Sequence, residues 1–153
     1  MPTSLRHHFA GFVLLAALML LLLCTPRAAA AGQSQQFGDH VVYYSALSTD
    51  MLTPEVARAY GLVRSSHQGL LNIAIRRAGD DGPAETGTVR GSAVNLSGQR
   101  VPVKFQEVRD GEAIYYLGTF PISGSDTVRF DLTVTPKGDA AHRLDFSRDY
   151  VVD

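Results

Sequence analysis

Alternation of apolar and polar side chains constrains the fold of this chain more than any other feature of its sequence. The pattern is clearest in residues 128–135, where Val, Phe, Leu and Val alternate with Arg, Asp and Thr. It recurs in residues 71–76, 101–106 and 144–146. Successive side chains of a β-strand point to opposite faces of the sheet, so each segment predicts a strand with one buried face.

Turn residues separate these segments at regular intervals. Asp110-Gly111 favours a two-residue hairpin, because both positions of such a turn need a positive φ. About seven strands are predicted, at residues 38–47, 69–77, 86–95, 100–108, 112–120, 126–135 and 142–152. Short strands without intervening helices indicate an all-β, immunoglobulin-like antiparallel sandwich, with a small barrel as the alternative.

Two of the predicted strands can be placed within their sheets. Pro102 lies on the outward face near the start of the segment 100–108, and proline suits an edge strand, where no ladder donor is lost. The segment 112–120 is apolar or aromatic on both faces. We therefore expect it to be a central strand.

One segment departs from the all-β pattern. Thr53 is a good N-cap, Pro54 suits the first helical position, and Glu55 lies near the positive end of the helix dipole. Gly61 supplies a left-handed stop. These residues predict a short helix inside a connection of roughly twenty residues, a length that is uncommon in compact domains and often functional.

The first 31 residues have the order of a secretory signal peptide. Arg6 belongs to a basic start, residues 9–23 are apolar, and small residues follow at 28–31. A membrane-spanning helix needs about 20 apolar residues, so a retained anchor is disfavoured. We expect cleavage after residue 30 or 31, a flexible lead-in over residues 32–36, and a single β-sandwich domain over 37–153.

Composition narrows the chemistry of the mature protein. Cys24 is the only cysteine and would leave with the leader, which excludes a disulfide, a thiol nucleophile and a cysteine metal site. Without the two arginines of the leader, 12 Lys and Arg stand against 15 Asp and Glu, a net charge of −3. This balance argues against nucleic acid or an anionic membrane as the main partner. No cofactor motif is present, so we expect no cofactor.

A metal site is a weak alternative. His40, His67 and Met51 carry imidazole and thioether groups, which suit copper in an exported protein. Their spacing matches no short metal-binding motif. The copper hypothesis requires the three side chains to converge within ligand distance.

Candidate catalytic groups are sparse. Ser65 and His67 can share one side of an extended segment, but no oxyanion-hole or nucleophile-elbow motif accompanies them. Glu107, Asp110 and Glu112 surround a hairpin tip, where carboxylates are usually solvated. We therefore expect surface charge there, and a small hydrolase remains an alternative.

Two groups of residues are candidates for binding. Adjacent tyrosines at 43–44 and 115–116 place one ring on each face of a strand, and we include Tyr44 and Tyr116 in a candidate aromatic patch. The long connection supplies the other candidates, which are Glu55, Tyr60, Arg64, Ser65 and His67. Glu55, Tyr60 and Arg64 are also expected to form a polar cluster that holds the connection down.

Several segments of the chain resemble one known family. They are Leu52–Ala57, Tyr60–Ser65, Leu70–Ala74, Asn95–Gln99, Phe105–Arg109, Ile114–Tyr116 and Phe37–Asp39. In these segments the chain resembles the DUF4426 family, small exported proteins of gamma-proteobacteria with no assigned activity. The resemblance implies a single periplasmic β-domain and no particular reaction.

These observations favour a binding function over catalysis. We interpret the chain as a non-catalytic binding or accessory module of the cell envelope, with no membrane anchor after cleavage. Its partner would be an envelope protein or a small periplasmic ligand. A periplasmic copper-binding or chaperone protein and a small hydrolase are the alternatives.

Overall fold

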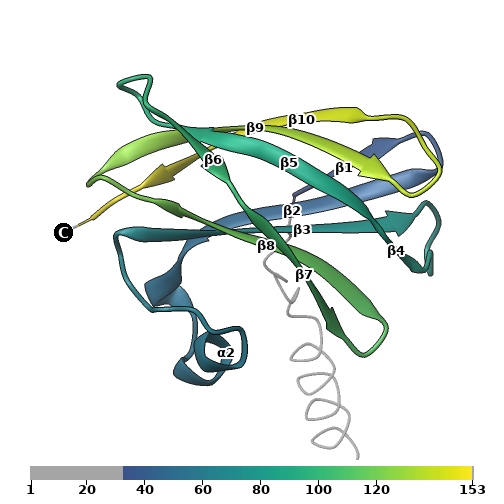
Figure 1. Ribbon diagram of the computed structural model, residues 1–153, viewed down its shortest axis with the longest axis horizontal. Helices are drawn as coiled ribbons and strands as arrows, with labels where there is room; N and C mark the ends of the chain where they lie inside the picture. The colour runs from purple at the N-terminus through teal and green to yellow at the C-terminus, as the bar shows by residue number, and fades with distance from the viewer. Residues whose placement is uncertain (1–32, 153) are drawn as a thin grey trace, which may run out of the picture. The chain divides into compact units, whose positions relative to one another are not determined.

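Two antiparallel sheets enclose one apolar core in residues 33–152, the part of the chain that this computed structural model describes (Figure 1). Sheet A has the order β1-β2-β3-β8-β7, with β4 also paired to β3, and sheet B has the order β10-β9-β5-β6. The prediction of an all-β sandwich is confirmed. The predicted signal peptide lies outside the described residues.

The strands of sheet A are β1 (Gln33–Phe37), β2 (His40–Ser48), β3 (Gln68–Arg77), β4 (Ala84–Glu85), β7 (Phe105–Asp110) and β8 (Ala113–Pro121). Those of sheet B are β5 (Gly87–Val94), β6 (Arg100–Val103), β9 (Asp126–Pro136) and β10 (His142–Tyr150). Two short helices, η1 (Thr49–Met51) and α2 (Pro54–Ala59), lie between β2 and β3. None of the helices in the described part of the chain has the length and apolar character needed to span a membrane.

The predicted alternation decides which side chains form the core. On β9, Val128, Phe130, Leu132 and Val134 are at most 3% exposed, whereas the intervening Arg129 faces solvent. Apolar side chains of sheet A pack against this row from the other side. Six of the seven predicted strands occur as single strands, because one face of each is apolar and must be covered. The seventh, residues 100–108, is divided.

The expectation of a flexible lead-in over residues 32–36 is wrong for residues 33–36. They form β1 with Phe37 and pair with β2 from Gln33↔Tyr44 to Phe37↔His40. Only Phe37 has a partly buried side chain, so the pairing uses the backbone and leaves no apolar signal in the sequence. Gly38, with φ of 54°, forms the tight turn between the two strands.

The predicted strand 100–108 is in fact two edge strands. The chain leaves sheet B at Lys104, so that β6 pairs with β5 and β7 pairs with β8. Val103 and Phe105 both pack on the core from either side of this crossing. Pro102 is exposed on an edge strand, and β8 is central in sheet A, as both patterns predicted.

The predicted helix is confirmed as α2. The Thr53 hydroxyl accepts a hydrogen bond from the Val56 N–H at 3.3 Å, and Gly61 follows the helix with φ of 64°. Leu70 points to the outer face of sheet A but is only 6% exposed. Since η1 contacts β3 at this end, we infer that the connection covers the outer face there.

Aromatic rings join the two sheets across the core. Phe120 of sheet A meets Phe130 of sheet B with ring centroids 4.9 Å apart, and Phe130 packs on Phe146 at 4.8 Å. Gly69, opposite Phe120 on β3, has no side chain, and the Phe120 ring lies where its Cβ would be.

We predict that Gly69→Ala destabilises the protein by about 1–3 kcal/mol, because the added methyl group must displace the Phe120 ring from a packed core. Urea unfolding measures the change. Thr88→Ala, at an exposed position of β5, is the control and should change the free energy of unfolding by less than about 0.5 kcal/mol. Equal effects of the two substitutions would contradict the packing argument.

Candidate ligand-binding site

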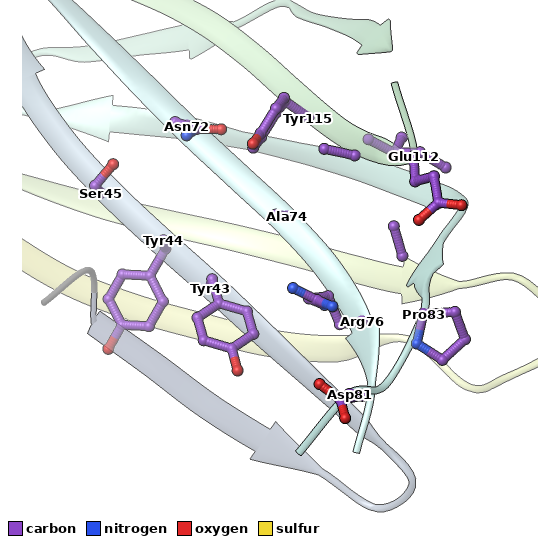
Figure 2. A pocket seen from close by; sticks show the side chains of 13 residues that line it. Tyr43, Tyr44, Ser45, Asn72, Ala74, Arg76, Asp81, Pro83, Glu112 and Tyr115 are labelled. Atoms are coloured by element: carbon purple, nitrogen blue, oxygen red, sulfur yellow. The ribbon is translucent and has the colours of Figure 1, made fainter. Parts of the chain in front are cut away.

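Sheet A has an open hollow on the face that points away from the core (Figure 2). Ser45, Asn72 and Ala74 line the hollow. The two neighbours of Ala74 on β3, which are Ile73 and Ile75, point the other way into the core. The volume of the hollow is about 820 Å³, within the roughly 300–1,000 Å³ typical of small-molecule sites.

The hollow lies where β3 and β8 part. Their pairing ends at Ile73↔Tyr116, and beyond this point β3 pairs with β4 through Ile75↔Glu85. The outer face therefore widens between β4 and the β7–β8 hairpin. The small side chain of Ala74 lies at this place and leaves the space open.

Two tyrosines and two turns surround the hollow. Tyr43 is opposite Ala74 on β2 and is 43% exposed, and Tyr115 is half-buried on β8. Asp81 belongs to the turn between β3 and β4, and Glu112 to the turn between β7 and β8. The hollow thus has aromatic sides and an acidic rim.

Two polar groups in the hollow differ in how they are satisfied. Arg76 donates a hydrogen bond from Nε to the Gly82 carbonyl at 2.8 Å and so fixes the β3–β4 turn. Asn72 Oδ1 is shielded from solvent and has no hydrogen-bond partner among the described residues. A buried acceptor without a donor costs about 1–3 kcal/mol. Because this oxygen is shielded from solvent, a ligand in the hollow does not reach it in this conformation.

The structure corrects the candidate aromatic patch. Tyr116 is only 5% exposed and belongs to the core. Tyr44 is among the residues that line the hollow, but its ring packs on Phe146 with ring centroids 4.5 Å apart. The rings on the outer face are those of Tyr43 and Tyr115. A pair of adjacent tyrosines does not show which ring points inward, since that depends on the neighbouring strands.

Tyr116 also forms a hydrogen bond with Glu107, one of the carboxylates that we expected at the surface. Its hydroxyl accepts the Gly87 N–H at 2.8 Å and donates to Glu107 Oε2 at 3.0 Å. Burial, followed by the contact with Glu107, raises the pKa of Tyr116 above its ordinary value. Glu107, Asp110 and Glu112 are all exposed, as expected, and Glu107 in addition accepts the Tyr116 hydroxyl.

Thr49 fixes the long connection, and the sequence did not indicate it. Its side chain is fully buried, donates to the Val63 carbonyl at 2.7 Å and accepts the Ser65 N–H at 3.0 Å. Arg64 donates to the Asp50 carbonyl at 2.8 Å. The expected cluster of Arg64 with Glu55 and Tyr60 is replaced by this backbone contact.

The structure does not pair the candidate nucleophile with the candidate base. Ser65 Oγ accepts the backbone N–H of His67 at 3.1 Å, a local turn contact. The His67 ring is exposed and forms no hydrogen bond with a serine hydroxyl among the described residues. Glu55 is also exposed and Tyr60 is half-buried, so these side chains form a surface rather than a pocket.

His40 binds two carboxylates from different parts of the sandwich. It is 5% exposed, with Nε2 3.0 Å from Glu85 of sheet A and Nδ1 3.0 Å from Asp139 in the β9–β10 turn. Both contacts are hydrogen bonds only if both ring nitrogens carry a hydrogen. Arg77 pairs with the other Glu85 oxygen at 2.8 Å, and His142 approaches Asp139 at 3.0 Å.

The structure separates the three residues of the copper hypothesis. His40 begins β2, whereas Met51 and His67 lie beyond the opposite end of this strand, near Ser48↔Gly69. Eight residue steps of about 3.3 Å place the two ends roughly 26 Å apart. His40, Met51 and His67 therefore cannot hold one metal ion.

We predict that Thr49→Val destabilises the protein by about 1–3 kcal/mol, since the Val63 carbonyl and the Ser65 N–H lose their partner at almost constant volume. Chemical unfolding measures the free energy, and hydrogen exchange of residues 49–67 should become faster. Thr119→Val, at an exposed position, is the matched control. Unchanged exchange in the Thr49 variant would show that the connection is held by other contacts.

We also predict a pH-dependent effect of Glu85→Gln. Hydrogen bonds from Arg77 and then His40 lower the pKa of Glu85 below its ordinary value of 4.5. The charged carboxylate therefore contributes stability above pH 4.5, and this contribution is lost as the pH falls through the lower folded-state pKa. Melting temperatures of parent and variant should differ at neutral pH and converge in strong acid, whereas a constant difference would refute the charge effect.

Comparison with known proteins agrees with this description. The family model "Domain of unknown function (DUF4426)" matches residues 34–153. The crystal structure of a DUF4426 family protein from Pseudomonas aeruginosa PAO1 is 37% identical, with a TM-score of 0.70, over 82% of this chain and 98% of that chain. A comparison with curated proteins finds no match.

Two more distant structures share the fold. FetP from uropathogenic Escherichia coli strain F11, expressed in the periplasm of E. coli, is 13% identical with a TM-score of 0.52, covering 78% of this chain and 92% of its own. A copper-bound FetP variant is 15% identical with a TM-score of 0.54, covering 79% and 95%. Identities this low show the fold alone. By its family match and its 37% identical relative, this chain belongs to the DUF4426 family.

Proposed function

We propose that this protein is a non-catalytic binding module of the periplasm that takes a small ligand in the hollow of sheet A. The hollow itself is the observation that carries this proposal. It has aromatic sides formed by Tyr43 and Tyr115, a small residue, Ala74, where the strands part, and polar side chains such as Ser45 and Arg76. Sites of this kind combine apolar walls with few polar groups that orient a ligand.

The proposed location rests on the sequence and on one distant relative. Residues 1–31 have the order of a secretory signal peptide. FetP, which shares the fold, was expressed in the periplasm. Export of this protein would place the hollow in contact with solutes of the cell envelope.

The alternative functions have less support from the geometry. Copper is bound by a FetP variant, but His40, Met51 and His67 lie too far apart here to share an ion. Among residues 33–152 no group of three or more His, Cys, Asp or Glu side chains has the arrangement of a metal site. A serine hydrolase built on Ser65 and His67 would need the hydroxyl paired with the imidazole, and Ser65 Oγ instead accepts the backbone N–H of His67.

A blocking substitution tests the proposal. Ala74→Trp would place a large ring in the hollow without entering the core, since Ala74 points outward. We expect a small-molecule extract of the cell envelope to shift the amide NMR signals of Asn72 and Tyr115 in the parent, and we expect these shifts to disappear in the variant.

Val63→Trp is the matched control, because it adds the same ring at a position that is 72% exposed in the connection. It should leave the ligand-induced shifts unchanged. Loss of the shifts in Val63→Trp and their retention in Ala74→Trp would refute the hollow as the site and favour the connection.

A further inference from the structure

The hollow lies at an interruption in the ladder of sheet A. On one edge of β8, pairing with β3 ends at Ile73↔Tyr116. On the other edge of β8, pairing with β7 continues to Asp110↔Ala113. Residues 113–115 therefore have a strand partner on only one edge within the described part of the chain, and all three line the hollow.

A second open strand edge borders the hollow. β4 pairs with β3 and with no other strand of residues 33–152, and Ala84 lines the hollow from β4. Because β2 pairs with the other edge of β3 from Gly69 to Arg77, β4 and β8 lie on the same side of β3. We refer to the space between β4 and residues 113–115 as the strand gap.

Open strand edges have backbone groups that can bind another strand. In a sheet, the N–H and C=O groups of a strand point to both of its neighbours. Residues 113–115 have β7 as their one neighbour in the described part of the chain, so the groups on their other edge point into the strand gap. An extended peptide can pair with such an edge, which gives affinity through the backbone and specificity through alternate side chains.

The strand directions and the ends of the strand gap suit one added strand. β4 and β8 are both antiparallel to β3, so they run in the same direction and one peptide can be antiparallel to both. The Tyr116 hydroxyl accepts the Gly87 N–H at 2.8 Å and bridges the gap at one end. The other end opens toward the turns that carry Asp81 and Glu112. Three residues of β8 extend about 10 Å, which sets the length of the paired segment.

The lining of the hollow indicates which side chains the peptide carries. Alternate side chains of a strand point to opposite faces of the sheet. Those that point inward meet Ala84 and Ile114, which pack in or against the apolar core. Those that point outward meet the open face, where Asp81 and Glu112 outnumber Arg76, the one cation that lines the hollow in the described part of the chain. Charge complementarity therefore favours a basic side chain on the outer face and apolar side chains on the inner face.

We propose, resting on the function proposed above, that the hollow binds an extended peptide segment that adds a strand to sheet A in the strand gap. The peptide pairs with residues 113–115 of β8. Its inward side chains are apolar, and its central outward side chain is basic and lies near Asp81 and Glu112. This arrangement completes the interrupted ladder and covers the open edges of β8 and β4.

Blocked pentapeptides test the proposal by NMR titration of the ¹⁵N-labelled protein, purified from cells that express the full chain. The parent probe is acetyl-Thr-Val-Lys-Val-Thr-amide, and a second probe has Glu in place of Lys. Two further probes carry N-methyl groups, one on the Lys amide and the other on both Val amides, because these amides point to opposite edges of the peptide. We expect the parent probe to shift the amide signals of residues 113–115 and to slow their hydrogen exchange.

The modified probes separate backbone pairing from charge. At least one N-methylated probe should bind about tenfold more weakly than the parent probe, since it loses ladder hydrogen bonds and places a methyl group between the strands. The Glu probe should also bind about tenfold more weakly. Asp81→Asn combined with Glu112→Gln should remove this preference for Lys over Glu. Asp50→Asn combined with Glu55→Gln, at exposed positions outside the hollow, is the charge-matched control and should retain it.

Distinct results would overturn the two proposals. Equal affinity for the parent probe and both N-methylated probes would refute strand addition. Tighter binding of the Glu probe would refute the basic side chain assigned to the peptide. If no probe shifts the signals of residues 113–115, but the response to the envelope extract still disappears in Ala74→Trp, the peptide class is refuted and the hollow remains a ligand site. If no probe binds and Ala74→Trp does not alter the response to the extract, the function proposed for the hollow is itself refuted.

Discussion

Burial of one apolar face from each sheet is the interaction on which the rest of this structure depends. Residues 33–152 contain no cysteine, so no disulfide supports the fold. The rings of Phe120, Phe130 and Phe146 pack across the interface between the sheets. Because the inner faces carry the stability, the outer face of sheet A is free to combine small, aromatic and charged residues. The hollow is compatible with the fold for this reason.

The hollow arises from the way the strands pair. β3 exchanges its partner β8 for the short strand β4 after Ile73, and the sheet opens at that point. The acidic rim lies on the two turns beside this opening, the β3–β4 turn with Asp81 and the β7–β8 turn with Glu112. Arg76 donates a hydrogen bond to the Gly82 carbonyl and so fixes the β3–β4 turn. The same side chain lines the hollow.

Much of the fold could be predicted from the sequence, because the signals concerned are local. Thr53 and Gly61 mark the ends of a helix through capping rules, and the alternation on β9 marks a half-buried strand. The β1 strand could not be predicted, since its side chains are polar and its contacts are made by the backbone. The break at Lys104 was also missed, because Val103 and Phe105 keep the same alternation although they belong to different sheets.

The candidate site was harder to predict for a physical reason. Tyr43 and Tyr115 meet Asn72 only through the pairing of three strands, and no local pattern encodes that register. The inclusion of Tyr116 in the candidate aromatic patch was wrong, because a pair of adjacent tyrosines does not show which ring points inward. The connection that carries Arg64 was chosen for its length, and the structure shows that Thr49, a residue without any motif, organises it.

The passage of the chain from β6 to β7 has a mechanical consequence. This one segment is an edge of sheet B before Lys104 and an edge of sheet A after it, so sliding of one sheet past the other has to change the backbone conformation at Lys104. His40 forms a second connection between the two sheets, because it contacts Glu85 of sheet A and Asp139 in the β9–β10 turn of sheet B. Since β7 continues into the turn that carries Glu112, the spacing of the acidic rim is coupled to the spacing of the sandwich. A force or solvent change that separates the layers would therefore be transmitted to the cavity as a change in its width.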